Sequence, residues 1–502
     1  MCKYVNKKII YKLTKIIIIM HRKSGYMRVF KYINRVLSIV LDIVFILLLV
    51  SVYRMGLIPL KYLVILSVLV VVLGVFFTIF SFKVKRLVLS IILLVFMLLF
   101  GTLSFIGIYY VWTTNSFFDT IEEVKEKKIY YVVVKKDSKY KELDDLDDET
   151  MAIFERQSNN YKKVLEEVRD SITIHDKEYT NMNTIVKDLL NGDVDSLLIN
   201  STNKEILDEN MDSFQSNTRV IAELSIDVIQ KKEQEEDKKY GPMNILISGI
   251  DTNGHIDSVS RSDVNIVVTI NPYTHEVLLT NIPRDMYVQL HGTTGLKDKL
   301  THAGIYGIDM SINTIEDFLE IDIPYYIRVN FDSVIKLVDT IDGVDVNNDV
   351  AFQGRTRYFE KGMIHLNGKE ALEYARERKK MPNGDNTRGE HQERIIEAII
   401  TKISSSKELL KDYGNILDDL KELFQTNIPT DTIKKYVRDQ IDTMSKWSVH
   451  REAVTGTAAS TYMETYSMPG MRLYVTIPDE ESRKDASNRI NELLEKVSNE
   501  KD

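Results

Sequence analysis

Arginine and aspartate occur together at two places within residues 260–290. Arg261 and Asp263 stand at the start of one apolar, β-branched run, and Arg284 and Asp285 follow the end of the next. Guanidinium groups grip phosphate oxygens through paired hydrogen bonds, so clustered arginines are typical of sites for phosphorylated ligands. The spacing predicts such a site, and its alternative is a salt-bridge network in which the acids only neutralise the arginines.

A β-hairpin would bring the two charged pairs together. The runs at 264–270 and 277–282 are joined by an Asn-Pro turn at 271–275, and strands that pair in this way have their free ends on one side. A preceding apolar run, 244–251, ends in Asp251 and can reach the same edge. We therefore expect a single charged site opposite the turn.

Further cations lie downstream, on two expected helices. The periodicity of 366–378 predicts a helix that ends with Arg376 and Arg378. A second helix follows a Pro-Asn-Gly loop, and its Arg388 and Gln392 are four residues apart, so they share one face. This chain has no glycine-rich phosphate loop of the GxxxxGK[ST] kind, so arginines would have to bind the phosphate oxygens.

Asp251 and Asp263 at this edge of the sheet indicate a possible metal-binding site. Asp251 and Asp263 would each repel a diphosphate by about 4 kcal/mol per close charge pair at an effective dielectric constant of about 20. A divalent hard cation between them removes that conflict. Two carboxylates, phosphate oxygens and water suit Mg²⁺, with Mn²⁺ as the alternative.

Composition narrows the classes of function. A chain of 502 residues usually forms more than one domain. Its net charge of −8 and its pI near 5.8 do not indicate general binding to nucleic acids. The single cysteine, Cys2, excludes an intramolecular disulfide and a thiolate metal cluster.

The first quarter of the chain is expected to cross a membrane. Apolar runs at 36–53, 62–82 and 87–112 approach or exceed the roughly 20 residues that a spanning helix needs. Asp42 lies within the first run, and we expect it to face another helix rather than lipid. Basic residues are concentrated before the first run and in the loop between the second and third. The positive-inside rule then predicts a multi-pass plasma-membrane protein with a cytoplasmic N-terminus and with residues 115–502 outside.

Alternating helix and strand patterns predict an α/β fold for the soluble part. Residues 130–134 and 196–199 resemble strands, 161–168 and 184–190 resemble helices, and the many charges among them are expected to face solvent. The predicted organisation has five parts: a cytoplasmic basic arm (1–35), three transmembrane helices (36–112), a small α/β accessory domain (115–229), a charged linker (230–240) and a second α/β domain (241–497).

Several motifs in combination carry a resemblance to a known family. They are GID at 249–251, RSD at 261–263, PRD at 283–285, KLTHA at 299–303, VNF at 329–331 and LNGKEALEYARER at 366–378. Residues 240–400 resemble the LytR-CpsA-Psr family, and three spans followed by an accessory domain resemble its CpsA-like subgroup. This chain departs from many members at Ser260, Ile308 and His391.

The resemblance implies an α/β/α domain around a central mixed sheet. It also implies a phosphotransferase that moves a capsule or teichoic-acid-like polysaccharide from undecaprenyl diphosphate onto peptidoglycan and leaves a phosphodiester. The metal-binding acids of the family fall on Asp251 and Asp263, and either could accept the proton of the attacking hydroxyl. The residues expected in catalysis are Asp251, Asp263, Arg284, Arg376 and Arg378. Those expected to bind the diphosphate are Arg261, Arg284, Lys299, Arg376, Arg378, Arg388 and Gln392.

Other functions stay open. The same site with water as acceptor would be a polyprenyl diphosphatase, and a membrane-bound regulator of envelope or capsule synthesis is a further alternative. A non-catalytic binder of wall polysaccharide would leave the acids beside the arginines unexplained. The expected partners are the lipid bilayer, the lipid-linked glycopolymer, peptidoglycan and machinery that exports capsule or wall polymers, with no nucleic acid.

Overall fold

The computed structural model describes residues 2–121, 125–154, 159–229, 240–250, 256, 259–377, 385–405 and 423–497. The chain divides into two compact units. A membrane unit comprises Met1–Phe118 with Ile433–Met444, and a soluble unit comprises Asp119–Thr432 with Ser445–Asp502.

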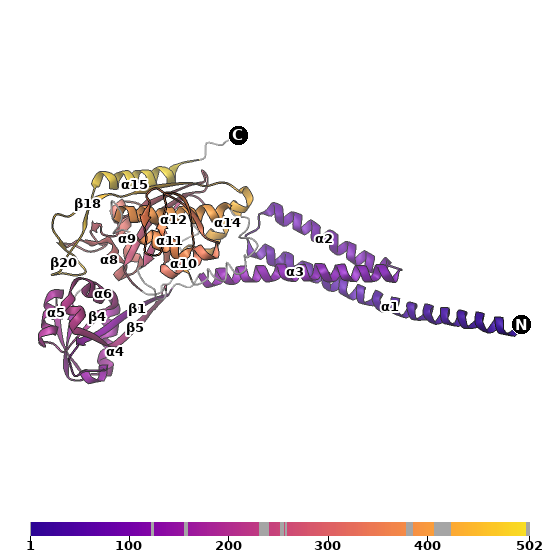
Figure 1. Cartoon of the computed structure of the whole chain (residues 1–502), viewed down its shortest axis with the longest axis horizontal. Coiled ribbons are helices and arrows are strands. Elements are labelled where there is room, and N and C mark those ends of the chain that lie inside the picture. The colour runs from indigo at the N-terminus through magenta and orange to yellow at the C-terminus, as the bar shows by residue number, and fades with distance from the viewer. Residues whose placement is uncertain are drawn as a thin grey trace. The chain divides into compact units, whose positions relative to one another are not determined.

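Three apolar helices form the membrane unit (Figure 1). Helix α1 spans Cys2–Met55, α2 spans Leu60–Lys83 and α3 spans Leu87–Ile121. Each contains a segment long and apolar enough to cross a bilayer, which fits the three predicted spans. Helix α1 starts well before its apolar segment, so the expected basic arm, 1–35, continues into the first span as one helix.

Polar side chains join these helices to one another. Asn34 on α1 donates hydrogen bonds of 2.9 Å to the carbonyl and the hydroxyl oxygen of Ser90. Asp42 accepts a hydrogen bond of 2.8 Å from the hydroxyl of Thr78 on α2, as expected of an acid that faces another helix. Gly74 leaves room for it, because a Cβ there would lie 2.6 Å from an Asp42 oxygen.

A fourth helix, α14 (Thr430–Thr443), contributes most of its length to the membrane unit and was not predicted. Asp442 on this helix forms an ion pair of 2.8 Å with Lys61. Arg438 donates a hydrogen bond of 2.8 Å from Nε to the carbonyl of Gly56, between α1 and α2. Helix α14 therefore contacts the loop that joins the first two spans.

The accessory domain is α/β, as predicted. Its five-stranded sheet has the order β3-β2-β4-β1-β5, and β2 runs parallel to β3 and β4 while β1 runs antiparallel to β4 and β5. Two hydrophobic clusters pack on this sheet, one with α4 and the other with α5, α6 and α7. The elements are β1 (Lys125–Lys135), η1 (Leu143–Leu146), β2 (Glu149–Phe154), α4 (Asn159–Ser171), β3 (Ile174–Tyr179), α5 (Met182–Asn191), β4 (Ser196–Asn200), α6 (Ser201–Asn210), α7 (Asp212–Asn217) and β5 (Thr218–Ile229).

The second soluble domain is built on a mixed six-stranded sheet with the order β16-β11-β6-β7-β8-β17. Helices α9 and α15 share a hydrophobic cluster with this sheet, and helices α10, α11 and α12 form another with the hairpin β12–β15. The sheet strands are β6 (Met243–Ile250), β7 (Ser262–Asn271), β8 (Glu276–Asn281), β11 (Tyr325–Val329), β16 (Phe424–Thr426) and β17 (Ser448–Ala453). The principal helices are α8 (Leu300–Ala303), α9 (Ile308–Leu319), α10 (Phe331–Thr340), α11 (Gly368–Arg376), α12 (Asp385–Ser405) and α15 (Glu480–Glu495).

Short strands connect these elements. They are β9 (Tyr287–Val288), β10 (Asp298–Lys299), β12 (Val344–Asn348), β13 (Phe352–Gln353), β14 (Tyr358–Phe359), β15 (Gly362–Leu366), β18 (Gly456–Ala458), β19 (Met463–Glu464), β20 (Arg472–Leu473) and β21 (Thr476–Pro478). A 3₁₀ turn, η2, spans Gly304–Tyr306.

Both boundaries of the helix predicted at 366–378 are wrong, because α11 spans Gly368–Arg376. The periodicity of 366–378 placed Leu366 in a helix, but Leu366 ends strand β15. The side chain of Asn367 accepts a hydrogen bond from the backbone N–H of Glu370 and so fixes the start of α11 at Gly368, two residues later than predicted. Apolar spacing is continuous across this cap, which is why periodicity alone did not find the boundary. The predicted linker, 230–240, lies outside the described residues except for Tyr240.

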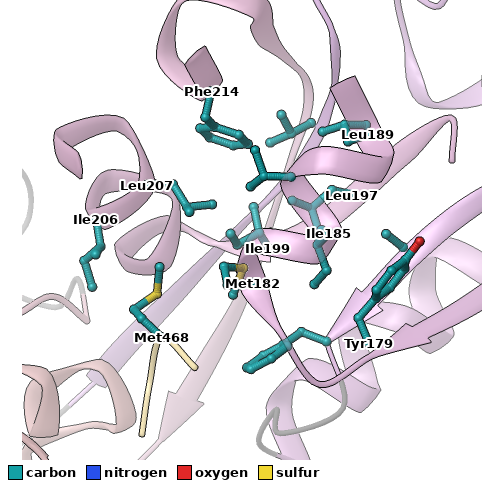
Figure 2. Close-up of a cluster of buried hydrophobic side chains, with 14 of the residues drawn as sticks. Tyr179, Met182, Ile185, Leu189, Leu197, Ile199, Ile206, Leu207, Phe214 and Met468 are labelled. Carbon is teal, nitrogen blue, oxygen red and sulfur yellow. The ribbon is translucent and has the colours of Figure 1, made fainter. Parts of the chain in front are cut away.

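The accessory domain and the second domain share a hydrophobic cluster (Figure 2). Met468 from the second domain lies among buried side chains of α5 and α6, together with Met471 and Leu473. Backbone hydrogen bonds reinforce this contact, including one of 2.9 Å from the N–H of Met182 to the carbonyl of Pro469. The two domains therefore pack against each other through this cluster.

Candidate anion-binding site

The hairpin of β7 and β8 brings the two charged pairs together, as predicted. The strands pair antiparallel, with Ile266 opposite Asn281. Asp263 stands near the start of β7 and Arg284 follows the end of β8, so the two meet at one edge of the sheet. The guanidinium Nη1 of Arg284 lies 2.5 Å from Oδ2 of Asp263.

Asp263 is buried at the centre of this edge and is only 6% exposed. Its Oδ2 also lies 3.4 Å from Nη2 of Arg388, and its Oδ1 accepts a hydrogen bond of 3.0 Å from the hydroxyl of Thr301. Burial by itself would raise the pKa of this carboxyl, but the charges of Arg284, Arg388 and Arg261 outweigh it and hold the pKa below its usual range. Asp263 is therefore ionised at neutral pH.

Asp285 holds the neighbouring cations in place. Its Oδ1 lies 2.5 Å from Nζ of Lys299, and its Oδ2 lies 3.7 Å from Nε of Arg284. Strands β9 and β10 pair Tyr287 with Lys299, which fixes the position of that lysine. Asp285 therefore orients both Arg284 and Lys299.

Helix α12 supplies the other side of the site. Arg388 and Gln392 lie on one face of it, as predicted, and each is 8% exposed. The amide of Gln392 donates a hydrogen bond of 3.4 Å to the carbonyl of Ala375, in the last turn of α11. Gly389 allows α12 to approach the sheet, because a Cβ at this position would clash with the side chain of Asn281 at the end of β8.

Two of the predicted residues contact partners other than Asp263. Both terminal nitrogens of Arg261 hydrogen-bond to the carboxylate of Glu209 on α6, at 2.7 and 2.8 Å. The guanidinium of Arg376 stacks over the ring of Phe331, with its central carbon 4.0 Å from the ring centroid. The remaining two predicted residues, Asp251 and Arg378, lie outside the described residues.

Sequence analysis missed Thr301 and Glu209. Thr301 belongs to the KLTHA motif and lies in the short helix α8, two residues after Lys299, which was a usable signal. Glu209 stands 52 residues before its partner on an amphipathic helix, so no local pattern marked it.

The charge balance of the site favours an anion. Among the described residues, the carboxylates of Asp263 and Asp285 face three cations, Arg284, Lys299 and Arg388. The side chains of these cations are 10–17% exposed, so their fields are weakly screened by solvent. An excess of buried positive charge at a sheet edge can bind and polarise a phosphorylated ligand.

The same residues fit a divalent cation that binds with the ligand. Asp263 is an ionised carboxylate with hard oxygen donors, and Mg²⁺ is commonly held by one or two carboxylates together with substrate phosphates. Within the described part of the chain, no three or more histidine, cysteine or acidic side chains form a metal-binding group. Strand β6 ends at Ile250, opposite Ser262, and Asp251 is the next residue in the chain.

Comparison with known proteins gives a family and several relatives. Residues 208–474 match the model of the LytR_cpsA_psr family. A polyisoprenyl-teichoic acid–peptidoglycan teichoic acid transferase, TagU, of Bacillus mycoides is 39% identical over 194 residues, which cover 38% of this chain and 62% of the relative. TagU of Bacillus subtilis is 32% identical over 274 residues, covering 54% of this chain and 85% of the relative.

Two solved structures of proteins named TagV and TagT are similar to this chain. TagV of B. subtilis is 32% identical, covers 52% of this chain and 100% of the solved chain, and has a TM-score of 0.43. TagT bound to LI-WTA is 26% identical, covers 52% of this chain and 95% of the solved chain, and has a TM-score of 0.40.

Proposed function

Because the chain belongs to the LytR_cpsA_psr family, whose model matches more than half of it, we propose that it transfers a wall glycopolymer from a polyprenyl diphosphate carrier to peptidoglycan. The observation that carries this proposal is the buried carboxylate of Asp263 between Arg284 and Arg388. Such an arrangement suits a ligand with two adjacent phosphoryl groups.

The named relatives indicate the class of substrate. TagU proteins act on polyisoprenyl-linked teichoic acid and peptidoglycan, as their name states. We propose an anionic, teichoic-acid-like polymer on an undecaprenyl carrier for this chain, with a capsule polysaccharide as the alternative. This chain matches about 62% of the length of the TagU protein of B. mycoides. The proposed substrate therefore depends on the chemistry of the site as well as on the names of the relatives.

In the proposed reaction, a sugar hydroxyl of peptidoglycan attacks the sugar-side phosphorus of the diphosphate. The bond from that phosphorus to the bridging oxygen breaks, undecaprenyl phosphate leaves, and a phosphodiester remains. Arg284, Lys299 and Arg388 bind the phosphoryl oxygens and stabilise the negative charge that develops on them. Arg376, Arg378 and Gln392 are proposed to complete this binding.

Asp263 is better suited to hold cations than to accept a proton. Its low pKa makes it a weak base, and both of its oxygens already accept hydrogen bonds or face guanidinium groups. A bound Mg²⁺ would polarise the phosphoryl oxygens and neutralise part of their charge. We propose Asp263 and Asp251 as its protein ligands, with Asp251 as the remaining candidate for the base.

The proposed location is the plasma membrane, with the soluble unit outside. The asymmetry of basic residues around the three spans supports this orientation.

The test is reconstitution with the full chain in detergent. The protein is incubated with an undecaprenyl-diphosphate-linked glycan, Mg²⁺ and a peptidoglycan oligomer, and products are analysed by mass spectrometry. We expect a new glycan–peptidoglycan phosphodiester and stoichiometric undecaprenyl phosphate. Release of glycan phosphate with no peptidoglycan adduct would identify a diphosphatase, and an unchanged substrate would contradict both activities.

A further inference from the structure

The accessory domain contributes a residue to the edge of the candidate site. Glu209, in the last turn of α6, forms a two-point contact with Arg261, in which Oε2 lies 2.7 Å from Nη1 and Oε1 lies 2.8 Å from Nη2. This is the end-on geometry in which a guanidinium also grips a phosphate. The carboxylate therefore occupies the same nitrogens that a phosphoryl group would use.

Arg261 is part of the electrostatic environment of the site despite this contact. Its charge is one of the three that lower the pKa of Asp263. In turn, Asp263 and Glu209 both raise the pKa of Arg261, against the opposing effect of its burial. The guanidinium thus interacts electrostatically with an acid of the site and with an acid of the accessory domain.

The helix that carries Glu209 packs in the shared cluster, whereas the side chain of Glu209 is largely exposed. Ile206 and Leu207 of α6 are 0–1% exposed and pack in the shared cluster that contains Met468 (Figure 2). The side chain of Glu209 itself is 54% exposed, whereas that of Arg261 is 11% exposed. Rotation of Glu209 into solvent would therefore remove its carboxylate from the two terminal nitrogens of Arg261 with no movement of the domain.

We propose that Glu209 determines the anion selectivity of the site by competing with the diphosphate for Arg261. In the free protein the carboxylate holds the guanidinium, and a ligand must displace it to gain that contact. This inference rests on the proposed function, because it takes a diphosphate as the ligand. It gives the accessory domain a part in substrate binding.

The energetics of exchange support this assignment. The ion pair of Glu209 with Arg261 is weak because one partner is exposed. Breaking it therefore lowers the affinity of the site for an anionic ligand only modestly. A diphosphate carries more charge than one carboxylate and bonds to Arg284 and Arg388 as well, so it can displace Glu209. A ligand with a single phosphoryl group must also displace Glu209 but forms fewer contacts with the arginines. It should therefore bind this site more weakly than a diphosphate does.

The experiment measures binding of inorganic pyrophosphate to the full chain in detergent by titration calorimetry, with farnesyl diphosphate as a second probe. Glu209→Gln retains the shape of the side chain and removes its charge. We expect this variant to bind pyrophosphate about three- to ten-fold more tightly than the wild type, because the competing ion pair is gone. Asp212→Asn, which removes an equal charge from an exposed position on the next helix, is the control and should change affinity less than two-fold.

A double-mutant cycle tests whether Glu209 affects pyrophosphate binding through Arg261. Arg261→Ala should weaken pyrophosphate binding, and Glu209→Gln should have no further effect in that background, because the two residues act through one contact. Tightening that persists without Arg261 would show a general charge effect and would overturn the proposal.

The outcomes separate this inference from the proposed function. A wild-type protein that binds neither pyrophosphate nor farnesyl diphosphate would contradict both. A protein that binds them, but whose Glu209→Gln variant binds equally or less tightly, would leave the proposed function standing and overturn the role of Glu209. Weaker binding in that variant would instead show that Glu209 orients Arg261 for the ligand.

Discussion

At the scale of single residues, Arg388 combines the two properties that binding of a diphosphate requires. It projects from a long helix toward Asp263, and its side chain is 10% exposed. A guanidinium in this position bears a full charge where solvent screens it little. Its proximity to Asp263 does not neutralise the site, because Arg284 lies closer to the same oxygen.

We predict that Arg388→Ala lowers turnover of a lipid diphosphate by at least about 100-fold, which corresponds to the loss of roughly 2.7–4 kcal/mol of transition-state stabilisation from one donor. Steady-state kinetics of the purified variant provides the measurement. Lys402→Ala, near the exposed end of the same helix, is the control and should retain full turnover. Equal activity of Arg388→Ala and wild type would assign the cluster a purely structural role.

The acids of the site give a second prediction, which separates a metal site from a salt-bridge network. If Asp263 binds Mg²⁺ with the diphosphate, a chelator should abolish activity and Mg²⁺ or Mn²⁺ should restore it. Asp263→Asn should raise the Mg²⁺ concentration for half activity by about ten-fold or more, because a negative ligand is lost. Asp285→Asn should change that concentration little, since Asp285 contacts Lys299 and Arg284. Turnover that is independent of metal in the wild type would contradict the proposed Mg²⁺ site.

At the scale of elements, α12 joins the site to a buried acid that the reaction does not use. Glu393 follows Gln392 and is 2% exposed, and its Oε1 is buried with no hydrogen-bond partner among the described residues. Burial raises the pKa of this carboxyl to about 8, although the charge of Arg451 partly opposes the shift. Glu393 is therefore protonated in the folded protein at neutral pH.

This pKa predicts how stability depends on pH. Between the ordinary value of 4.5 and about 8, Glu393 is protonated when folded and ionised when unfolded. Its contribution to stability is thus fully present below pH 4.5 and is lost as pH rises through 8. Glu393→Gln mimics the protonated form, so it should gain on the order of 3 kcal/mol over the wild type at pH 8.5 and little at pH 5. Thermal unfolding of both proteins across this range is the measurement, and a pH-independent difference in Tm would contradict the assignment.

The elements also show what the sequence could and could not predict. Alternating β-branched residues and an Asn-Pro turn predicted β7 and β8, and the hairpin geometry then brought Arg284 to Asp263. Helix α14 has apolar residues at helical spacing, Ile433, Tyr436, Val437 and Ile441, so a helix could have been predicted there. Its contacts with the membrane unit through Asp442 and Arg438 are polar and long-range, so the sequence did not indicate them. The contact of Arg261 with Glu209 depends on how two domains pack, and neither residue's neighbours in the sequence specify that packing.

At the scale of the whole molecule, the surface of the membrane unit suits lipid, whereas the surface of the soluble unit suits water. Side chains such as Val64, Val72 and Leu98 are 52–59% exposed in α2 and α3, as expected for helices that face lipid. The polar groups of these helices, including Asn34 and Asp42, are instead directed at neighbouring helices. A site for a lipid-linked substrate on the same chain as this anchor would keep the enzyme at the bilayer that holds its substrate.

The orientation of the anchor is the last prediction. Lys83, Lys85 and Arg86 cluster between α2 and α3, whereas the loop near Gly56 has fewer basic residues, so the positive-inside rule places the α2–α3 loop in the cytoplasm. Alkaline phosphatase fused after Ile121 should then be active, and β-galactosidase fused there should be inactive. Fusions at Val84, in the α2–α3 loop, should give the opposite pattern and provide the control. An active β-galactosidase after Ile121 would place the diphosphate site in the cytoplasm, where peptidoglycan is absent, and would contradict the transferase.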